Sequence, residues 1–240
     1  MKIGIIGAME IEVNSLIDSM EKCKVTRISM SDFYEGEIEG VSCVVARCGI
    51  GKVAAAVTAQ TMILHYAPDL IINTGVGGAL ARELRPGDIV VSSRALQYDM
   101  DTSPLGDPVG LISGINRIYF EADKKASDEL VKIAVRLGNG VMRGTVCSGD
   151  RFVASTEEKE RILSHFPDGA VCEMEGAAIA HTAYLSATPF VIVRAISDSA
   201  DGSSHVDYMT FLADAAQRSY EIVKQYIKDS KNNFAFSFAF

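Results

Sequence analysis

The chain has 240 residues, and its formal net charge of −8 argues against nucleic acid or an anionic membrane as a partner, because binding phosphates requires a cationic surface. Apolar residues make up 48% of the sequence, enough for the core of one large α/β domain or two small ones. No apolar run reaches the roughly 18 residues of a membrane span, so no membrane-spanning helix is expected.

Cysteine and histidine usage indicates neither disulfides nor a metal site. The five cysteines are odd in number and show no CxxC spacing, and the four histidines are scattered. Reduced structural thiols fit this pattern, so we expect no metal and no cofactor. The apolar start, residues 1–7, is broken too early by glycine for a signal peptide. We therefore expect a cytoplasmic protein.

The first elements already suggest a site. Residues 2–7 form an apolar run, which is typical of a strand buried on both faces. A glycine turn follows, and then a helix with its apolar residues at helical spacing (Val13, Leu16, Ile17, Met20). Glu10 and Glu12 lie at this turn, where ligands approach the backbone in α/β folds. Acids of a first turn that complement the helix dipole would explain one of them equally well.

An antiparallel meander and a helix come next. The meander is predicted over 24–30, 33–39 and 41–48, and the helix over 53–65. The segment Gly49-Ile50-Gly51-Lys52 between them only superficially resembles a phosphate loop, since the pattern GxxxxGK[ST] is absent. Lys52 is interpreted as a surface or capping lysine.

A glycine-rich segment follows the next strand, which is predicted over 69–73. Residues 74–79 read Thr-Gly-Val-Gly-Gly-Ala. Glycines permit positive φ and a close approach of the backbone to a ligand. A plain turn is the alternative, but the density of glycine at the carboxyl end of a strand favours a ligand-binding loop.

The middle of the chain is predicted as a strand (89–95), a helix (127–137), a strand (141–147) and a helix capped by Thr156. Residues 99–118 show no period and contain several prolines and glycines. A loop of this length in a compact domain is usually functional or lies at an interface.

Two carboxylates flank a methionine where a buried strand meets a helix, at Glu173-Met174-Glu175. Residues two apart share one face of a strand, so both acids could point at one site. The alternative is that one caps the helix and the other is solvated. The following apolar strand, 189–198, delivers Arg194 and Asp198 at its carboxyl end. Charges in a sheet interior are costly unless paired or functional.

A long helix is predicted over 207–228, and it closes a single domain of residues 1–228. The tail, 229–240, alternates aromatic and small residues. It could add an edge strand or pack on a neighbour, and a frayed terminus is an equal alternative.

The candidate residues all follow predicted strands, and parallel-type sheets place their sites at that edge. They comprise acids, one arginine, an aromatic residue and glycine-rich backbone, without metal ligands or a Ser–His pair. This set suits acid/base cleavage of a polar small molecule.

Several segments together resemble one family over almost the whole chain, to about residue 228. They are Gly4-Ile5-Ile6-Gly7-Ala8-Met9-Glu10 with Glu12, Gly49-Ile50-Gly51-Lys52-Val53-Ala54-Ala55, Ile72-Asn73-Thr74-Gly75, Ser148-Gly149-Asp150 with Phe152, Glu173-Met174-Glu175, and Val193-Arg194-Ala195-Ile196-Ser197-Asp198. The chain resembles the 5′-methylthioadenosine/S-adenosylhomocysteine nucleosidases of the purine nucleoside phosphorylase superfamily.

The resemblance implies a three-layer αβα fold with a mixed, twisted central sheet, and a homodimer. It implies hydrolysis of the N-glycosidic bond of methylthioadenosine and adenosylhomocysteine, in methionine salvage and methyl-cycle recycling. The partners are then the nucleoside and water. A loop at 102–112 would close the pocket of the neighbouring subunit.

The resemblance also assigns roles. Asp198 would protonate the purine at N7, Glu12 would activate water, and Arg194 would belong to the catalytic group. The predicted substrate-binding residues are Glu175 and Met174 at the ribose, Phe152 and Val153 at the adenine, Met9, Ile50 and Tyr208 at the 5′ group, and also Val76, Gly77, Gly78, Glu173 and Ser197. Of the two paired acids, Glu175 would hold the ribose and Glu173 would serve the surrounding structure.

One departure bears on the reaction type. Related phosphorylases place an arginine and a serine on phosphate where this chain has Asn73 and Val76, so hydrolysis is favoured over phosphorolysis. Some hydrolase relatives carry serine at position 76, which leaves the role of Val76 open. A hydrolase for futalosine-type nucleosides or adenosine, and a non-catalytic nucleoside-binding protein, are the alternatives.

Overall fold

The computed structural model describes residues 1–201 and 204–235. Its elements are β1 (Lys2–Gly7), α1 (Glu10–Asp18), β2 (Glu21–Ile28), β3 (Ser31–Ile38), β4 (Val41–Arg47), α2 (Lys52–Tyr66), β5 (Leu70–Ala79), β6 (Ile89–Gln97), a 3-10 turn (Ser103–Leu105), β7 (Phe120–Glu121), α3 (Lys124–Arg136), β8 (Val141–Ser148), α4 (Thr156–His165), β9 (Gly169–Glu173), α5 (Gly176–Leu185), β10 (Phe190–Asp198) and α6 (Ser204–Ala235).

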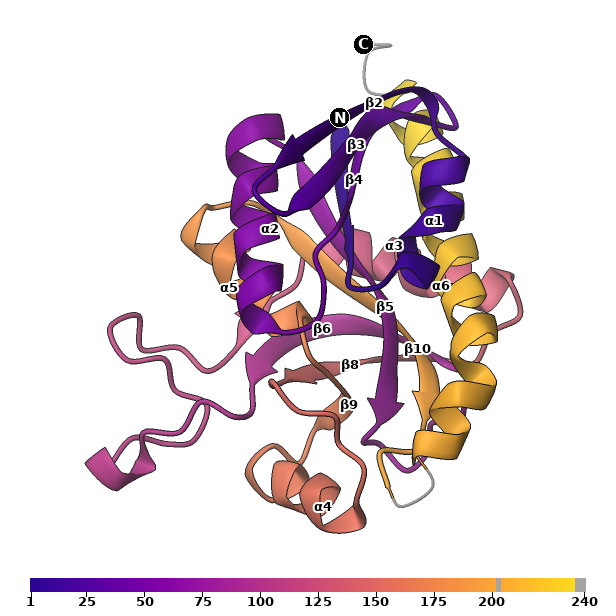
Figure 1. The fold of residues 1–240 in the computed structure, drawn as a ribbon. Coiled ribbons are helices and arrows are strands. Elements are labelled where there is room, and N and C mark those ends of the chain that lie inside the picture. Colours follow the sequence, from indigo (N-terminus) through magenta and orange to yellow (C-terminus); the bar gives the residue numbers. More distant parts are fainter. Residues whose placement is uncertain (202–203, 236–240) are drawn as a thin grey trace.

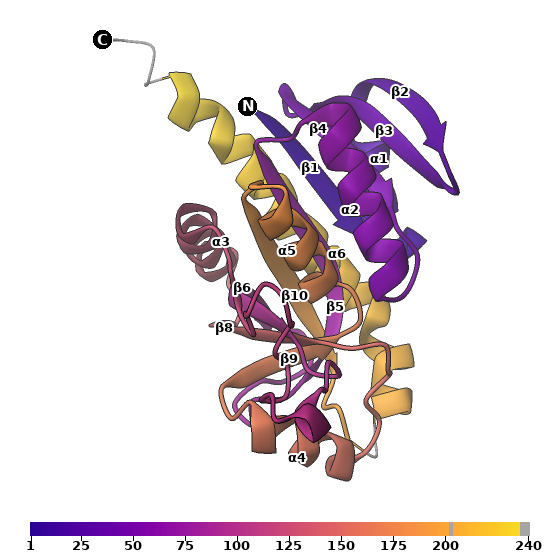
Figure 2. The ribbon, with the colours of Figure 1, turned by 90° about the vertical axis from the view of Figure 1, so that its left-hand side faces the viewer.

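The strands form one mixed sheet between two layers of helices, which confirms the predicted αβα architecture. Helices α2 and α5 cover one face, and α1 and α6 cover the other (Figure 1). Figure 2 shows the β2–β4 meander and α4 at opposite ends of the molecule. The meander pairs antiparallel as predicted, and β1 lies parallel to both β4 and β5.

Part of the sheet closes on itself, which the sequence did not indicate. The strand order is β10-β6-β8-β9-β5-β1-β4-β3-β2, and β10 pairs in addition with β5. Strands β5, β9, β8, β6 and β10 therefore form a ring. Because β5 pairs with β1 near its start and with β9 near its end, its carboxyl end bends into this ring.

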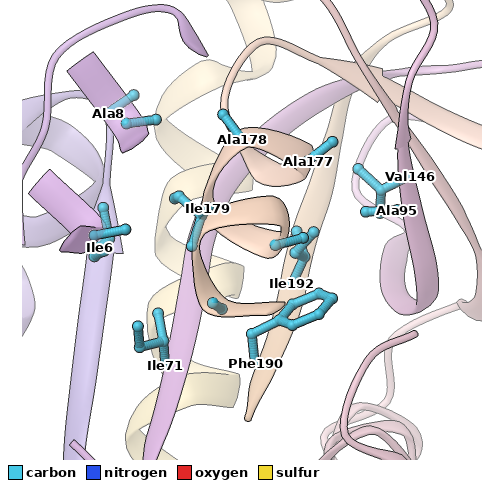
Figure 3. Close-up of a cluster of buried hydrophobic side chains, with 14 of the residues drawn as sticks. Ile6, Ala8, Ile71, Ala95, Val146, Ala177, Ala178, Ile179, Phe190 and Ile192 are labelled. Carbon is cyan, nitrogen blue, oxygen red and sulfur yellow. The ribbon is translucent and has the colours of Figure 1, made fainter. Parts of the chain in front are cut away.

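Each face of the sheet carries its own apolar core, because helices cover both faces. One core joins β5 and β10 to the alanine-rich side of α5, where Ala177 and Ile179 lie close to Ile192 and Phe190 of the strand (Figure 3). The other joins the sheet to α1, α3 and α6. Burial on both faces explains the apolar runs in the first parts of β1, β5 and β10, while the polar residues of β5 and β10 follow toward the strand ends.

The glycine-rich segment 74–79 is the end of a strand, so the prediction of a loop there is wrong. β5 continues through Ala79, all its residues are buried, and Gly75, Gly77 and Gly78 do not have positive φ. The reason for glycine is close approach instead. A Cβ at Gly75 would overlap Glu12 Oε1, and one at Gly78 would lie 2.9 Å from Asp198 Oδ1.

Two helix boundaries also differ from prediction. α4 is capped by the Ser155 hydroxyl, which accepts a hydrogen bond from the Glu158 amide, and not by Thr156. The helix expected over 207–228 spans Ser204–Ala235, so the first part of the predicted tail is helical. Residues 236–240, which hold the remaining aromatic residues, lie outside the described residues.

Segment 99–118 is irregular, as predicted, apart from the short 3-10 turn and one isolated bridge between Ile112 and Arg117. It projects from the body of the molecule at the lower left of Figure 1. Within the described ranges, no helix is long and apolar enough to cross a membrane.

Candidate active site

A pocket opens where the sheet strands end, and a concave site of this kind is the usual place for a small-molecule ligand. Its lining comes from segments far apart in sequence: Ala8, Met9, Glu12, Ile50, Val76, Gly77, Gly78, Arg151, Phe152, Val153, Cys172, Glu173, Met174, Glu175, Ser197, Asp198 and Tyr208. The structure thus brings every predicted site residue into one cavity except Arg194, which lies buried behind it.

Three lining residues were not predicted: Ala8, Arg151 and Cys172. Each directly precedes a predicted site residue in the chain. Their position next to a predicted site residue at a strand end could have indicated them in the sequence. Both neighbours of an inward-facing residue can reach a narrow cavity.

Glu12 is held between the start of α1 and the end of β5. Its Oε2 accepts hydrogen bonds from the amides of Ala8 (2.7 Å) and Met9 (2.9 Å), and its Oε1 accepts one from the Val76 amide (3.1 Å). Glu12 therefore completes the first turn of α1 and also lines the pocket, so both interpretations of this acid hold. Glu10 instead pairs with Arg47 at the surface.

Burial raises the pKa of Glu12, because desolvation disfavours the carboxylate. The positive charge of Arg194 and the three backbone amides act in the opposite direction. Glu12 is therefore a carboxylate with enhanced basicity that nevertheless has support for its charged form.

Arg194 and Glu173 form a buried ion pair with an Nη2–Oε2 distance of 2.5 Å. Nη2 also donates to Asn73 Oδ1 at 2.5 Å, while the Arg194 Nε has no partner among the described residues. Burial would lower the pKa of Arg194, but the carboxylates of Glu173, Glu12 and Glu175 raise it. The guanidinium is thus a fixed positive charge beneath several acids.

The carboxylate of Glu173 is occupied by contacts with the residues around it. Besides Arg194, it accepts hydrogen bonds from the Ser148 hydroxyl and from the amides of Glu175 (3.1 Å) and Gly176 (2.7 Å) at the start of α5. It lines the pocket but has few acceptor positions left for a ligand. The idea of a paired-carboxylate site at Glu173 and Glu175 therefore does not match the geometry.

Glu175 faces the pocket and accepts a hydrogen bond at Oε1 from the amide of Gly51 (2.7 Å) at the start of α2. Burial and the nearby charge of Glu173 raise the pKa of Glu175 to about 8, against the effects of Gly51 and Arg194. A protonated carboxyl at neutral pH both donates and accepts hydrogen bonds, which suits a site for sugar hydroxyls.

Asp198 ends β10 and is buried. Its Oδ2 accepts a hydrogen bond from the Ser197 hydroxyl (2.9 Å), and its Oδ1 accepts one from the Ala200 amide (2.8 Å). Gly78 of β5 is its strand partner. This places Asp198 at the side of the pocket formed by Gly77, Gly78 and Cys172.

The mouth of the pocket is apolar and exposed. The rings of Phe152 and Tyr208 meet edge to face with centroids 5.5 Å apart, and the Tyr208 hydroxyl lies 3.3 Å from Met9 Sδ. Phe152 is 45% exposed and Ile50 is 64% exposed. Aromatic and aliphatic side chains left open to solvent beside a cavity are typical of a ligand-binding surface.

The site contains acids, amides and aromatic rings. Among the side chains that the structure describes, no group of three or more His, Cys, Asp and Glu residues could hold a metal ion. Buried carboxylates from both ends of the chain can move protons and stabilise a cation between them.

Comparison with known proteins agrees with this geometry. A model of the phosphorylase superfamily matches residues 2–228. The chain is 40% identical to the 5′-methylthioadenosine/S-adenosylhomocysteine nucleosidase of Haemophilus influenzae over 95% of this chain and 99% of that protein.

Solved structures give the same result. The nucleosidase of the same name from Neisseria meningitidis, in complex with methylthio-immucillin-A, superposes with a TM-score of 0.92 at 38% identity, covering 95% of this chain and 99% of the other. A futalosine hydrolase of Helicobacter pylori superposes with a TM-score of 0.90 at 30% identity, covering 95% and 97%. The chain therefore belongs to the 5′-methylthioadenosine/S-adenosylhomocysteine nucleosidases of the phosphorylase superfamily.

Proposed function

We propose that the chain hydrolyses the N-glycosidic bond of 5′-methylthioadenosine and S-adenosylhomocysteine. The products are adenine and the corresponding 5-thio-substituted ribose, and the reaction serves methionine salvage and the methyl cycle. The observation that carries this proposal is the convergence of three buried carboxylates, Glu12, Glu175 and Asp198, on one pocket with an aromatic mouth.

Departure of adenine requires a proton, because the free base is a poor leaving group as an anion. Asp198 is the proposed donor to purine N7, with Ser197 and the Ala200 amide orienting its two oxygens. Phe152 stacks on the purine, and the backbone of Val153 contacts its edge. General acid catalysis of this kind contributes about 10²–10⁴-fold.

Water attacks the anomeric carbon, and Glu12 is the proposed general base. The raised pKa of Glu12 makes it the stronger base, and Arg194 supports the carboxylate form that accepts the proton. Arg194 is then a residue that acts through Glu12 and Glu173.

Cleavage develops positive charge on the ribose. The Glu12 carboxylate stabilises this cation more than it stabilises the neutral substrate, which lowers the barrier. Glu175 and the backbone of Met174 are proposed to bind the ribose hydroxyls. The 5′-alkylthio group then lies against Met9, Ile50 and Tyr208.

Phosphate is a poor fit as the nucleophile. The Asn73 amide donates to Ile6 O (2.9 Å) and accepts from Arg194, and Val76 has no polar side-chain atom. Neither can neutralise a phosphate dianion, which favours water.

A homodimer is part of the proposal. Ile50 at the pocket mouth is exposed, Val53 and Val57 of the following helix α2 are exposed as well, and Leu105 on the projecting loop is 84% exposed. Loop 102–112 contributes nothing to the described lining of its own pocket. It is therefore proposed to close the pocket of a second copy.

The reaction is proposed to take place in the cytoplasm. The cysteines of the structure are all free, and burial raises the pKa of Cys43 to about 12. The four buried thiols, Cys43, Cys48, Cys147 and Cys172, are inert packing groups that suit a reducing compartment.

The decisive test is release of free base in phosphate-free buffer from methylthioadenosine, adenosylhomocysteine, adenosine, inosine and a futalosine derivative. Release of adenine from both thioethers, unchanged when phosphate is added, supports the proposal. Strict phosphate dependence would instead identify a phosphorylase.

Hydrolysis of a futalosine-type nucleoside is the second candidate, because a futalosine hydrolase shares the fold at 30% identity. The same panel separates the two. A preference of kcat/KM for the futalosine derivative over both thioethers would reassign the substrate without changing the reaction class.

A further inference from the structure

A lysine outside the pocket ties two backbone carbonyls together behind Asp198. Lys159 lies in α4, and its Nζ donates to the carbonyl of Ala79 (2.7 Å) and to that of Ser199 (2.9 Å). Hydrogen bonds from a charged donor are about twice as strong as neutral ones. The two carbonyls belong to the ends of different strands, so the ammonium fastens one to the other.

The Ser199 carbonyl belongs to the turn that directly follows Asp198. Ala200 in that turn is fully buried and has the left-handed φ of 50°. This conformation is unfavourable for a residue with a Cβ. Because the Ala200 amide binds Asp198 Oδ1, relaxation of the turn would move the carboxylate.

The Ala79 carbonyl lies at the end of β5, next to Gly78. Gly78 is the strand partner of Asp198, and the pairing is irregular there, with a register shift between Ile196 and Asp198. The regular ladder between β10 and β5 is therefore interrupted at this point. Lys159 adds a clamp across this irregularity.

The charges of Lys159 and Asp198 both affect the pKa of the Cys172 thiol in the pocket lining. Burial raises the pKa of Cys172, the carboxylate of Asp198 raises it further, and Lys159 lowers it. The ammonium and the carboxylate therefore act on the same part of the pocket.

The preceding residue of α4, Glu158, contacts the loop that is proposed to face the purine. Glu158 pairs with Arg151 at 2.5 Å and accepts a hydrogen bond from the Ala154 amide (3.2 Å). These partners flank Phe152 and Val153. Two consecutive residues of α4 thus connect the loop that faces the purine with the turn that carries Asp198.

We propose that Lys159 is a positioning residue for the leaving base, holding the Asp198 turn against the end of β5 so that the carboxyl group meets the purine. This inference rests on the proposed role of Asp198 as proton donor. Lys159 itself does not line the pocket and touches no reacting atom.

The first test is Lys159→Met, assayed with methylthioadenosine. A misplaced acid lowers kcat, and a displacement near 1 Å costs about a hundredfold. We expect kcat to fall about tenfold to a hundredfold, with KM changed less than about twofold, since the binding surfaces stay in place. Lys159→Arg should restore most of kcat, because a guanidinium can also donate to two carbonyls. Lys132→Met, which removes an exposed ammonium from α3, is the matched control and should match the wild type.

The second test replaces adenine with a leaving group that needs no proton, in the 4-nitrophenyl glycoside of 5-methylthioribose. Nitrophenolate departs as the anion, so both Lys159→Met and Asp198→Asn should hydrolyse it at close to the wild-type rate. With methylthioadenosine, the double variant should be no slower than Asp198→Asn alone, because the two residues act in one step.

The outcomes separate this inference from the function it rests on. If Asp198→Asn releases adenine normally, the proposed acid is wrong. If Asp198→Asn is inactive on methylthioadenosine but Lys159→Met matches the control, the acid stands and the positioning role is wrong. Equal losses of Lys159→Met on both substrates would show a general structural defect and overturn the inference as well.

Discussion

The floor and the mouth of the pocket differ in polarity and in exposure to solvent. At the floor, Glu12, Glu173 and Arg194 are buried, and nearly every polar atom has a defined partner. At the mouth, Ile50 and Phe152 are apolar and open to solvent. In the proposed mechanism, proton transfer therefore depends on groups that are fixed before substrate arrives, and recognition of the 5′ group depends on surfaces that a ligand and a second copy would cover.

The largest effect is expected from the two buried acids that are assigned to proton transfer. Glu12→Gln and Asp198→Asn should each lower kcat for methylthioadenosine by at least about 10²–10⁴-fold, because each removes one proton transfer. Steady-state adenine release measures this, and thermal unfolding checks that the fold is intact. Near-normal release by either variant would contradict its assigned role.

Stability should respond most to the buried ion pair. Arg194→Met leaves the Glu173 carboxylate buried without its partner, which should cost about 3–5 kcal/mol of unfolding free energy. Arg136→Met, at the surface pair with Asp229, is the matched control and should cost less than about 1 kcal/mol.

Urea titration measures both variants. Combining Arg194→Met with Glu173→Gln removes the unpaired charge, so part of the lost stability should return. Equal losses in the buried and surface variants would refute the view that the floor is electrostatically fixed.

The pH dependence of stability should reveal Glu175. Its pKa in the folded protein is about 8, which lies above the ordinary value of 4.5 that is expected in the unfolded chain. Below both values the carboxyl is neutral in both states. Between them only the unfolded chain ionises, so stability falls as pH rises, and the fall ends above the folded pKa.

Glu175→Gln removes this contribution. The melting temperature of the wild type should therefore decline relative to that of the variant from about pH 4.5 to about pH 8. Parallel melting curves across this range would contradict the raised pKa of Glu175.

The smallest effect is expected at the mouth. Leu105→Asp puts a charge on the projecting loop, far from the described pocket of its own chain. If the loop closes a neighbouring site, KM should rise about tenfold, about the loss of one buried apolar side chain, with a smaller change in kcat. Val135→Asp, at an exposed position of α3 that has no part in the proposed dimer contact, controls for added surface charge.

Mixing variants sharpens this test. A Glu12→Gln chain has an intact loop, and a Leu105→Asp chain has an intact floor. Hybrid dimers would therefore contain one complete site, and activity at low substrate should exceed the sum of the separate variants. Strict additivity after subunit exchange would argue against a shared site.

Much of the architecture could be predicted from local pattern. The apolar runs of β1, β5 and β10 and the helical period of α1 are properties of neighbouring residues, so they are visible in sequence. The glycines of β5 misled prediction, because glycine at a strand end usually indicates a turn. Here Gly75 and Gly78 are needed for the approach of Glu12 and Asp198, which lie far away in the chain.

The sequence by itself determined which residue types stand at the strand ends, and hence the family and the members of the pocket. Only the tertiary structure decided how the acids divide their work. Glu173 and Glu175 look equivalent in sequence, but Arg194 and the start of α5 occupy the first, while Gly51 and the cavity face the second. The role of a carboxylate is set by burial and by partners that chain folding brings from distant segments, and no local pattern records them.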